Sequence, residues 1–199
     1  MKRAPIFLFL FAALTSVPST SRAQSPSSPN VTPKQETAPN PPPSLSSRVP
    51  APKPDDVKSL DSILHAIYDV ISGPAGERDW NRFRSLFVPE ARLTSNTRRD
   101  GGPVRLLDVE GFASGAGNYF KTHPFYESAI VNRVQKFGNI AQVFSSYESR
   151  TAPSEKPFAR GVNSIQLFNH GSRWWVLSIL WDEESPANPL PPELATPAK

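Results

Sequence analysis

The sequence predicts an α+β fold in which three N-terminal helices precede a four-strand antiparallel meander. Apolar residues recur at helical spacing between residues 58 and 122. Between residues 125 and 182, β-branched and aromatic residues instead alternate or cluster, as in strands. Short connections rich in Gly, Asn and Ser separate several of these later segments, which indicates sequential hairpins. The helices should therefore pack on one face of a curved sheet.

The first helix is expected over residues 58–72. Its apolar stripe consists of Leu60, Ile63, Leu64, Ile67, Tyr68 and Ile71. Gly73 and Pro74 then stop the helix.

A second helix is expected over residues 79–87, with Asp79 as its N-cap. Pro89 ends it, and a short strand follows at residues 91–95. The third helix should begin at Asp108 and run to about residue 122. Its interior glycines make it a weak helix former, so tertiary packing must stabilise it.

The four meander strands are expected at residues 125–137, 140–150, 158–168 and 173–182. The last of these carries three tryptophans. Under ideal alternation, Trp175 and Trp181 face one side of the sheet and Trp174 faces the other. Because neither face of this strand is polar throughout, we expect both faces to be covered.

The N-terminus predicts export. Lys2 and Arg3 precede an apolar run at residues 6–14 and small residues that end at Ala23, which is typical of a signal peptide cleaved after Ala23. The run is shorter than the roughly 20 residues of a membrane span. The chain has no cysteine to carry a lipid or a disulfide. We expect a periplasmic or secreted protein with no stable membrane anchor.

Composition divides the rest of the chain. Residues 24–57 are rich in Pro and Ser and predict a disordered spacer, because they offer too little apolar surface to offset their ordering entropy. Residues 185–199 form a second Pro-rich segment, expected to be a tail along the surface. The folded domain should span residues 58–184, a length that supports one core.

Charge argues against a nucleic-acid partner. The formal charge of +4 includes Lys2, Arg3 and Arg22, and without them 19 basic residues face 18 acidic ones. The remaining basic cluster, at Arg98, Arg99 and Arg105, is interleaved with aspartates. We interpret it as a solvated turn.

The order of elements and several segments resemble the nuclear-transport-factor-2-like superfamily, which includes SnoaL-like and ketosteroid-isomerase-like domains. The segments are DWNRFRSLFVPEARLTS, the third helix from Asp108, GNIAQVFSSYESR and HGSRWWVLSILWDEE. The resemblance covers residues 58–184. It implies a cone-like curved sheet, a pocket between the helices and the concave sheet face, and frequently a homodimer through the other face.

In the isomerase-like branch, a tyrosine on the first helix donates to a developing oxyanion and an aspartate at the first strand acts as base. Tyr68 falls near the tyrosine position. The base position falls near Ser95, and serine cannot do that work unaided. Tyr68 is equally explained as a core tyrosine.

His123 follows the third helix and is a candidate for general acid–base chemistry, or else a turn residue before Pro124. His65 and His170 are expected to be solvated. Three scattered histidines have no metal-ligand spacing. We therefore expect no metal site and no cofactor.

Polar residues interrupt the apolar strands. They are Glu127, Tyr147, Arg160, Asn163 and Gln166. Buried polar groups need partners, so they either pair with one another, for example Glu127 with Arg160, or contact a ligand. Alternation puts Asn163 and Gln166 on opposite faces. The ligand-contact candidates are Tyr68, Trp80, Tyr119, His123, Glu127, Tyr147, Arg160, Asn163 and Trp181.

Three functions stay open at this point. The preferred one is an exported module that binds a small apolar ligand. The second is a SnoaL-like isomerase, dehydratase or cyclase, with His123 or Glu127 as acid–base and Tyr68 as oxyanion donor. The third is a protein-interaction module that uses the outer sheet face and predicts a filled interior. The sequence does not decide whether the protein is an enzyme.

Overall fold

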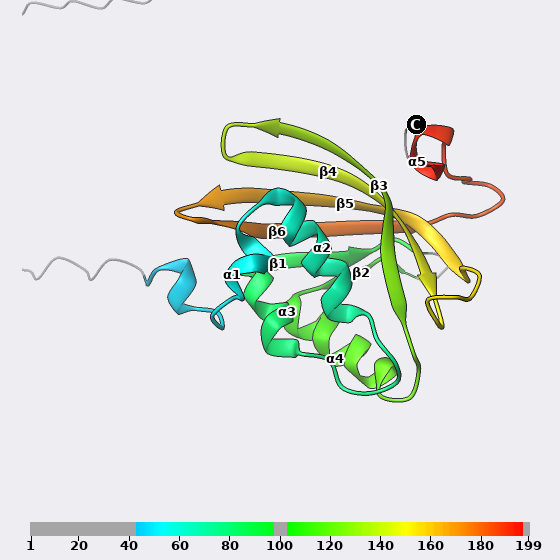
Figure 1. Ribbon diagram of the computed structural model, residues 1–199, viewed down its shortest axis with the longest axis horizontal. Coiled ribbons are helices and arrows are strands. Elements are labelled where there is room, and N and C mark those ends of the chain that lie inside the picture. Colours follow the sequence, from blue (N-terminus) through cyan, green and yellow to red (C-terminus); the bar gives the residue numbers. More distant parts are fainter. Residues whose placement is uncertain (1–42, 98–102, 197–199) are drawn as a thin grey trace, which may run out of the picture. The chain divides into compact units, whose positions relative to one another are not determined.

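The computed structural model describes residues 43–97 and 103–196 (Figure 1). The predicted signal peptide and the predicted spacer up to residue 42 lie outside the described residues, as do Arg98 and Arg99. Within the described ranges, no helix is long and apolar enough to cross a membrane.

The predicted α+β class is confirmed. A curved, open sheet of six strands has the order β2-β1-β6-β5-β4-β3, and all neighbours are antiparallel except β1 and β6, which are parallel. The strands are β1 (Phe87–Ser95), β2 (Arg105–Leu107), β3 (Tyr126–Phe137), β4 (Ile140–Arg150), β5 (Ala159–His170) and β6 (Arg173–Glu183). The helices are α1 (Pro54–Val57), α2 (Leu60–Ile71), α3 (Trp80–Leu86), α4 (Val109–Phe120) and α5 (Pro192–Ala195), with a 3-10 turn, η1, at Leu45–Ser47.

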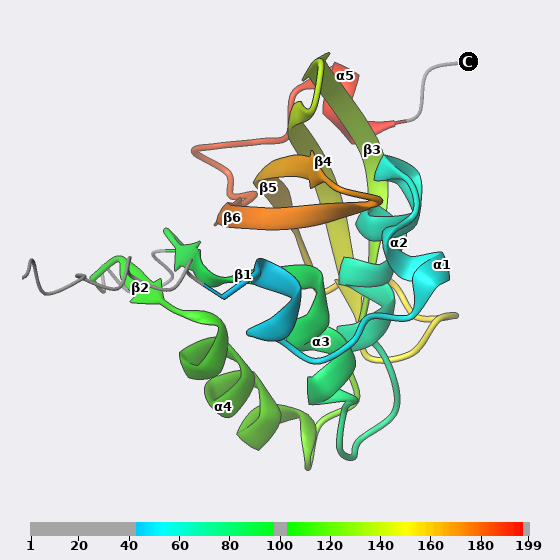
Figure 2. The same ribbon diagram turned by 90° about the vertical axis from the view of Figure 1, so that its left-hand side faces the viewer.

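Helices α2, α3 and α4 lie on the concave side of the sheet, as predicted (Figures 1 and 2). Each begins at a polar N-cap, namely Ser59, Asp79 and Asp108. Each cap side chain accepts a hydrogen bond from the backbone N–H three residues later, at 3.0, 2.9 and 2.7 Å respectively. The apolar stripe of α2 is buried, with Ile63 and Leu64 at most 2% exposed. These contacts fix the helices as one wall of the interior.

The hairpins also form as predicted. Phe137 pairs with Ile140 across a two-residue turn in which Gly138 has φ +52°. His170 pairs with Arg173 across a second tight turn.

The predicted short strand begins four residues earlier than expected. Helix α3 ends at Leu86, and Phe87 is already the first residue of β1. Pro89 is tolerated inside β1 because the pairing with β6 is irregular between Phe87 and Arg92, where a missing N–H breaks no regular ladder bond. Strand β2, expected as part of a turn, pairs with the end of β1.

The predicted facing of the tryptophans is wrong. The pairing of β5 with β6 shifts at Leu177, so Trp174 and Trp181 share the concave face and Trp175 lies on the other face. This bulge inserts one residue and thereby reverses the alternation. Both faces are covered at Trp174 and Trp175, which are 6% and 1% exposed, but not at Leu177, which is 44% exposed.

The ordered fold starts before the expected boundary at residue 58. Val57 is buried, and Leu45 and Val49 pack against the core. Asp56 accepts two hydrogen bonds from the Arg82 guanidinium, at 2.7 and 2.9 Å. A few apolar side chains among the prolines and one largely buried ion pair therefore bind residues 43–57 to the domain.

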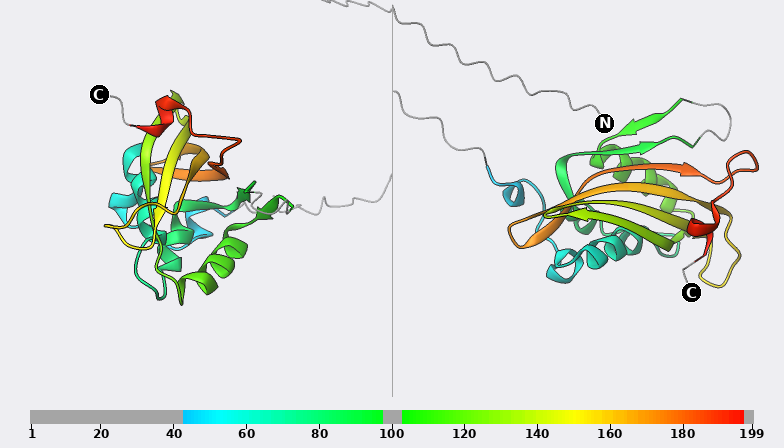
Figure 3. Two further views of the ribbon diagram at one scale, coloured as in Figure 1. Left: turned by 90° about the vertical axis from the view of Figure 1, so that its right-hand side faces the viewer. Right: turned by 90° about the horizontal axis from the view of Figure 1, so that it is seen from above.

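The C-terminal segment lies against the outer face of the sheet (Figure 3). The guanidinium groups of Arg133 and Arg160 donate to the backbone oxygens of Glu193 and Ala195, at 2.9 and 3.3 Å. Leu194 is 7% exposed. The segment thus covers part of the face that the resemblance assigns to a homodimer.

Candidate functional site

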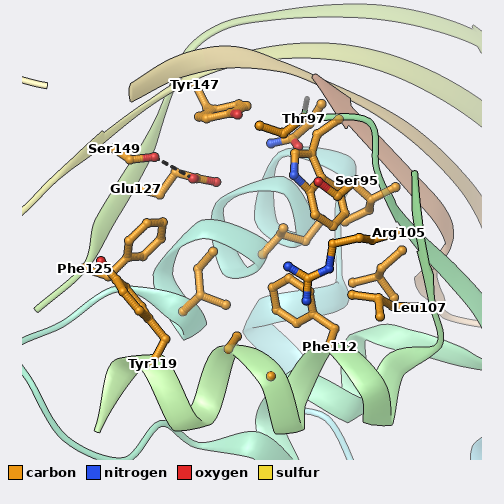
Figure 4. Close-up of a pocket in the computed structure, with 18 of the residues that line it drawn as sticks. Ser95, Thr97, Arg105, Leu107, Phe112, Tyr119, Phe125, Glu127, Tyr147 and Ser149 are labelled. Atoms are coloured by element: carbon orange, nitrogen blue, oxygen red, sulfur yellow. Dashed lines mark hydrogen bonds between the residues drawn. The ribbon is translucent and has the colours of Figure 1, made fainter. Parts of the chain in front are cut away.

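A cavity of about 580 Å³ lies between the helices and the concave face of the sheet (Figure 4). Residues from α2, α3, α4 and from all six strands line it. Most of the wall is apolar, and its rings are those of Phe83, Phe87, Phe112, Tyr119, Phe120, Phe125, Tyr147, Phe158 and Trp181. The hollow interior departs from the filled interior that an interaction module predicts.

One end of the cavity carries a hydrogen-bonded carboxylate. Glu127 of β3 is the cross-strand neighbour of Ser149 of β4, whose hydroxyl donates to Glu127 Oε2 at 2.8 Å. Tyr147 and Asn163 line the same region from β4 and β5. We call these four residues the Glu127 end.

Burial raises the pKa of Glu127 to about 7. The hydrogen bond from Ser149 acts against this shift, the negative charge of Glu183 adds to it, and the Asn163 amide again acts against it. A carboxyl group with this pKa exchanges its proton near neutral pH, so it can accept or donate a proton in contact with a bound molecule.

A chain of hydrogen bonds runs behind this end of the cavity. Asn163 Nδ2 donates to Tyr68 Oη at 3.1 Å, and Ser145 Oγ donates to Asn132 Oδ1 at 2.6 Å. The remaining contact of 2.5 Å, between Tyr68 Oη and Ser145 Oγ, is therefore donated by Tyr68. The chain fixes the Asn163 amide in the cavity wall.

Tyr68 itself lies behind the wall and does not line the cavity. It is 5% exposed, and burial raises its pKa above the ordinary tyrosine value. Because its only proton is donated to Ser145, the hydroxyl is not aimed at a bound oxyanion. This geometry does not fit the oxyanion-donor role that the resemblance implies, and it fits the alternative of a core tyrosine.

Tyr147 is positioned by the absence of a side chain opposite it. Its cross-strand neighbour on β5 is Gly161. A Cβ on Gly161 would lie 2.7 Å from Tyr147 Oη and 2.2 Å from the Asp182 carbonyl oxygen. Both distances are shorter than atoms tolerate, so this end of the cavity requires glycine there.

The other end of the cavity carries a basic group. Arg105 opens β2 and is the cross-strand neighbour of Ser95 at the end of β1. Figure 4 shows its side chain reaching into the cavity next to the Phe112 ring. Ser95 and Thr97 also line the cavity, and in Figure 4 Thr97 lies beyond Ser95 from Arg105. We call Ser95, Thr97 and Arg105 the Arg105 end.

Five of the predicted ligand contacts line the cavity, namely Tyr119, Glu127, Tyr147, Asn163 and Trp181. Tyr68, Trp80, His123 and Arg160 do not. Trp80 packs instead against α4, where a Cβ on Gly117 would be 3.2 Å from its ring.

His123 does not line the cavity. Its ring is exposed and stacks on that of Tyr119 with centroids 4.3 Å apart, and its Nδ1 lies 3.0 Å from the Tyr119 carbonyl oxygen. A role at the end of α4 explains these contacts, and they do not support His123 as a general acid or base. Arg160 lies on the outer face and pairs with Glu184 at 3.3 Å, so the suggested Glu127–Arg160 pair does not form.

Sequence reasoning missed Thr97, Arg105 and Ser149 as cavity residues, and considered Ser95 only as a failed base. Thr97 and Arg105 reach the cavity because β1 pairs with β2, where the sequence predicted a loop. Among the described residues, no group of three or more His, Cys, Asp or Glu side chains is placed to hold a metal ion.

Solved structures share this fold. A protein of cystatin-like fold from Caulobacter vibrioides is 11% identical, with a TM-score of 0.50 over 64% of this chain and 89% of that chain. A protein of unknown function from Mycobacterium tuberculosis is 10% identical, with a TM-score of 0.50 over 68% and 77%. An NTF-2-like protein of unknown function from Silicibacter pomeroyi is 12% identical, with a TM-score of 0.47 over 63% and 92%.

No protein-family model matches the sequence, and no curated protein matches it. At identities of 10 and 11%, the likeness to the two structures with a TM-score of 0.50 shows a shared fold, described as cystatin-like for the Caulobacter vibrioides protein, and nothing of activity.

Proposed function

We propose that this domain binds a small, mostly apolar molecule in the cavity between its helices and its sheet. The observation that carries the proposal is an aromatic-lined cavity of about 580 Å³ with a hydrogen-bonding carboxyl group at one end. Its volume lies within the roughly 300–1,000 Å³ of small-molecule sites, which combine an apolar wall with a few placed polar groups.

A binding measurement with a neutral fluorescent probe tests this proposal. We expect N-phenyl-1-naphthylamine to bind saturably. Ala116→Phe, which places a ring in the cavity from α4, should weaken the binding at least about tenfold, because it removes the volume the probe needs.

Ser114→Phe is the matched control, since Ser114 lies on the same helix but is exposed outside this cavity. Equal binding by both variants, or no saturable binding by the wild type, contradicts the proposal. Native mass spectrometry of the purified protein, compared with denaturing conditions, then identifies any molecule retained from the host.

Acid–base catalysis is a second candidate, and the pKa of Glu127 near 7 favours it. Glu127 would remove a proton next to a substrate carbonyl and return it two carbons away, as in the isomerisation of cyclohex-3-enone to cyclohex-2-enone. We expect a rate that rises with pH through about 7 and is lost in Glu127→Gln. A rate unchanged by that substitution excludes this role.

Export and homodimerisation remain proposals. The signal-like residues 1–23 support export, and detection of a chain that begins at Gln24 in an exporting host tests it. Phe144 and Leu180 are 44% and 48% exposed on the outer sheet face, which supports a dimer. Light scattering of the wild type against Phe144→Glu measures that assembly.

A further inference from the structure

Arg105 is a cation without a counter-charge in the described structure. No carboxylate of residues 43–97 or 103–196 lies within ion-pair distance of its guanidinium. Most other arginines on this domain are engaged, such as Arg84 with Glu110 at 2.6 Å and Arg82 with Asp56 at 2.7 Å. Arg105 instead extends over the cavity beside Phe112 (Figure 4).

A second polar group at this end also lacks a partner. Thr97 Oγ1 is buried and makes no hydrogen bond within the described structure. It lines the cavity together with Ser95, which neighbours Arg105 across the strand pair. A buried hydroxyl without a partner is costly, and a bound group that accepts its hydrogen bond removes that cost.

The opposite end of the cavity has the opposite charge. Glu127 lies across the cavity from Arg105 (Figure 4), and Glu183 is close enough to raise the pKa of Glu127 through its charge. Aromatic and aliphatic walls separate the two ends. A negatively charged group is therefore repelled at the Glu127 end and attracted at the Arg105 end, so the cavity orients an asymmetric molecule.

We propose that the cavity binds an amphipathic carboxylic acid, with its carboxylate on Arg105 and Thr97 and its apolar body against Phe112 and Trp181. Guanidinium and carboxylate match in a two-point hydrogen-bonded pair, and the Thr97 hydroxyl donates to the same group. A hydroxyl or other donor at the far end of the molecule reaches Glu127. This inference names the ligand class of the proposed binding site and rests on that function.

Three probes with one naphthalene body test the charge preference, namely 2-naphthylacetate, 2-(2-naphthyl)ethanol and 2-(2-naphthyl)ethylamine, by calorimetry at pH 8. We expect the acid to bind most tightly. Arg105→Gln should weaken acid binding about tenfold or more and alcohol binding less than about threefold, because the charge-assisted pair serves the acid alone. Retained alcohol binding shows that the variant is folded.

Arg92→Gln is the matched control, because it removes the same charge from an exposed residue of β1 that has no place in the cavity lining. It should leave all three affinities within about twofold. The proposal is overturned if Arg105→Gln leaves acid binding unchanged, if Arg92→Gln weakens it equally, or if the amine binds most tightly. Binding of N-phenyl-1-naphthylamine without any of the three probes overturns this inference alone, whereas binding of no probe overturns the proposed function as well.

Discussion

The two ends of the cavity are built in different ways. At the Glu127 end, polar groups of the fold bond to one another: the Ser149 hydroxyl donates to Glu127, and Asn163 donates to Tyr68, which donates to Ser145. At the Arg105 end, the guanidinium and the Thr97 hydroxyl have no partner within the described residues. The fold itself supplies the hydrogen-bond partners at the Glu127 end, whereas at the Arg105 end a ligand would have to supply them.

The difference separates stability from binding. Removing a group that the fold has satisfied leaves its partner unpaired and costs folding free energy. Removing a group that nothing satisfies costs little folding free energy but removes a contact that a ligand would use. Substitutions at the Glu127 end should therefore change the free energy of unfolding, and substitutions at the Arg105 end should change binding alone.

Gly161→Ala should give the largest loss of stability, about 3 kcal/mol or more, at the Glu127 end. The new Cβ would stand 2.2 Å from the Asp182 carbonyl oxygen, a backbone atom that cannot swing aside. Urea unfolding measures the change.

Gly115→Ala is its control, because a Cβ there meets nothing within 4 Å and lies inside α4. It should raise stability by roughly 0.5–1 kcal/mol. If Gly161→Ala changes the free energy of unfolding only slightly, β5 and β6 can move apart at little cost, and the Glu127 end is not rigid.

Glu127→Gln should stabilise the protein by about 2 kcal/mol at pH 8 and change little at pH 4. The pKa of Glu127 is about 7 in the folded state against an ordinary value of 4.5, so the folded state binds the proton more tightly. Raising the pH from 4.5 through 7 therefore favours unfolding of the wild type, and the variant lacks this loss.

Unfolding free energies of both proteins at pH 4, 6 and 8 measure the effect. The amide can still accept the Ser149 hydrogen bond, so the contact of 2.8 Å is kept. If the wild type instead gains stability relative to the variant above pH 7, Glu127 is ionised without penalty and the carboxyl is not buried as described.

Tyr68→Phe should destabilise the protein by about 1.5 kcal/mol. The substitution removes the hydroxyl that accepts from Asn163 and donates to Ser145, and leaves the Asn163 amide without this acceptor. Tyr119→Phe is the control, because Tyr119 is 47% exposed and its substitution should change stability by less than about 0.5 kcal/mol. Equal effects in the two variants would show that the hydrogen-bond chain adds nothing to the Glu127 end.

Sequence patterns predicted the parts of this comparison that depend on local chemistry. Asp79 and Asp108 cap their helices because a short polar side chain can bond the first free N–H groups wherever the helix lies. The turn between β3 and β4 was predictable because it contains Gly138, and glycine readily adopts the positive φ that this turn requires. Glu127 was singled out because a carboxylate among apolar strand residues needs a partner.

Non-local pairing was beyond the same reasoning. One extra residue at Leu177 puts Trp174, and not Trp175, on the same face of the sheet as Trp181, and nothing in the sequence of β6 marks it as a bulge. Arg105 faces the cavity because β2 pairs with β1, which in turn lies parallel to the last strand of the chain. The local sequence around Arg105 indicates only a basic residue that follows a glycine-containing turn, and it does not predict that the side chain faces a cavity.

Arg105→Gln should have the smallest effect on stability, less than about 0.5 kcal/mol in either direction, although it should have the largest effect on acid binding. The guanidinium has no ion pair with any described residue, so its loss leaves no carboxylate unpaired. Thermal unfolding without ligand, and again with saturating 2-naphthylacetate, separates the two quantities. Ligand should raise the unfolding temperature of the wild type more than that of the variant, since only the wild type gains the ionic contact. A loss of more than about 1 kcal/mol in the ligand-free variant would show that Arg105 is already held by the fold, and the two ends of the cavity would then be built alike.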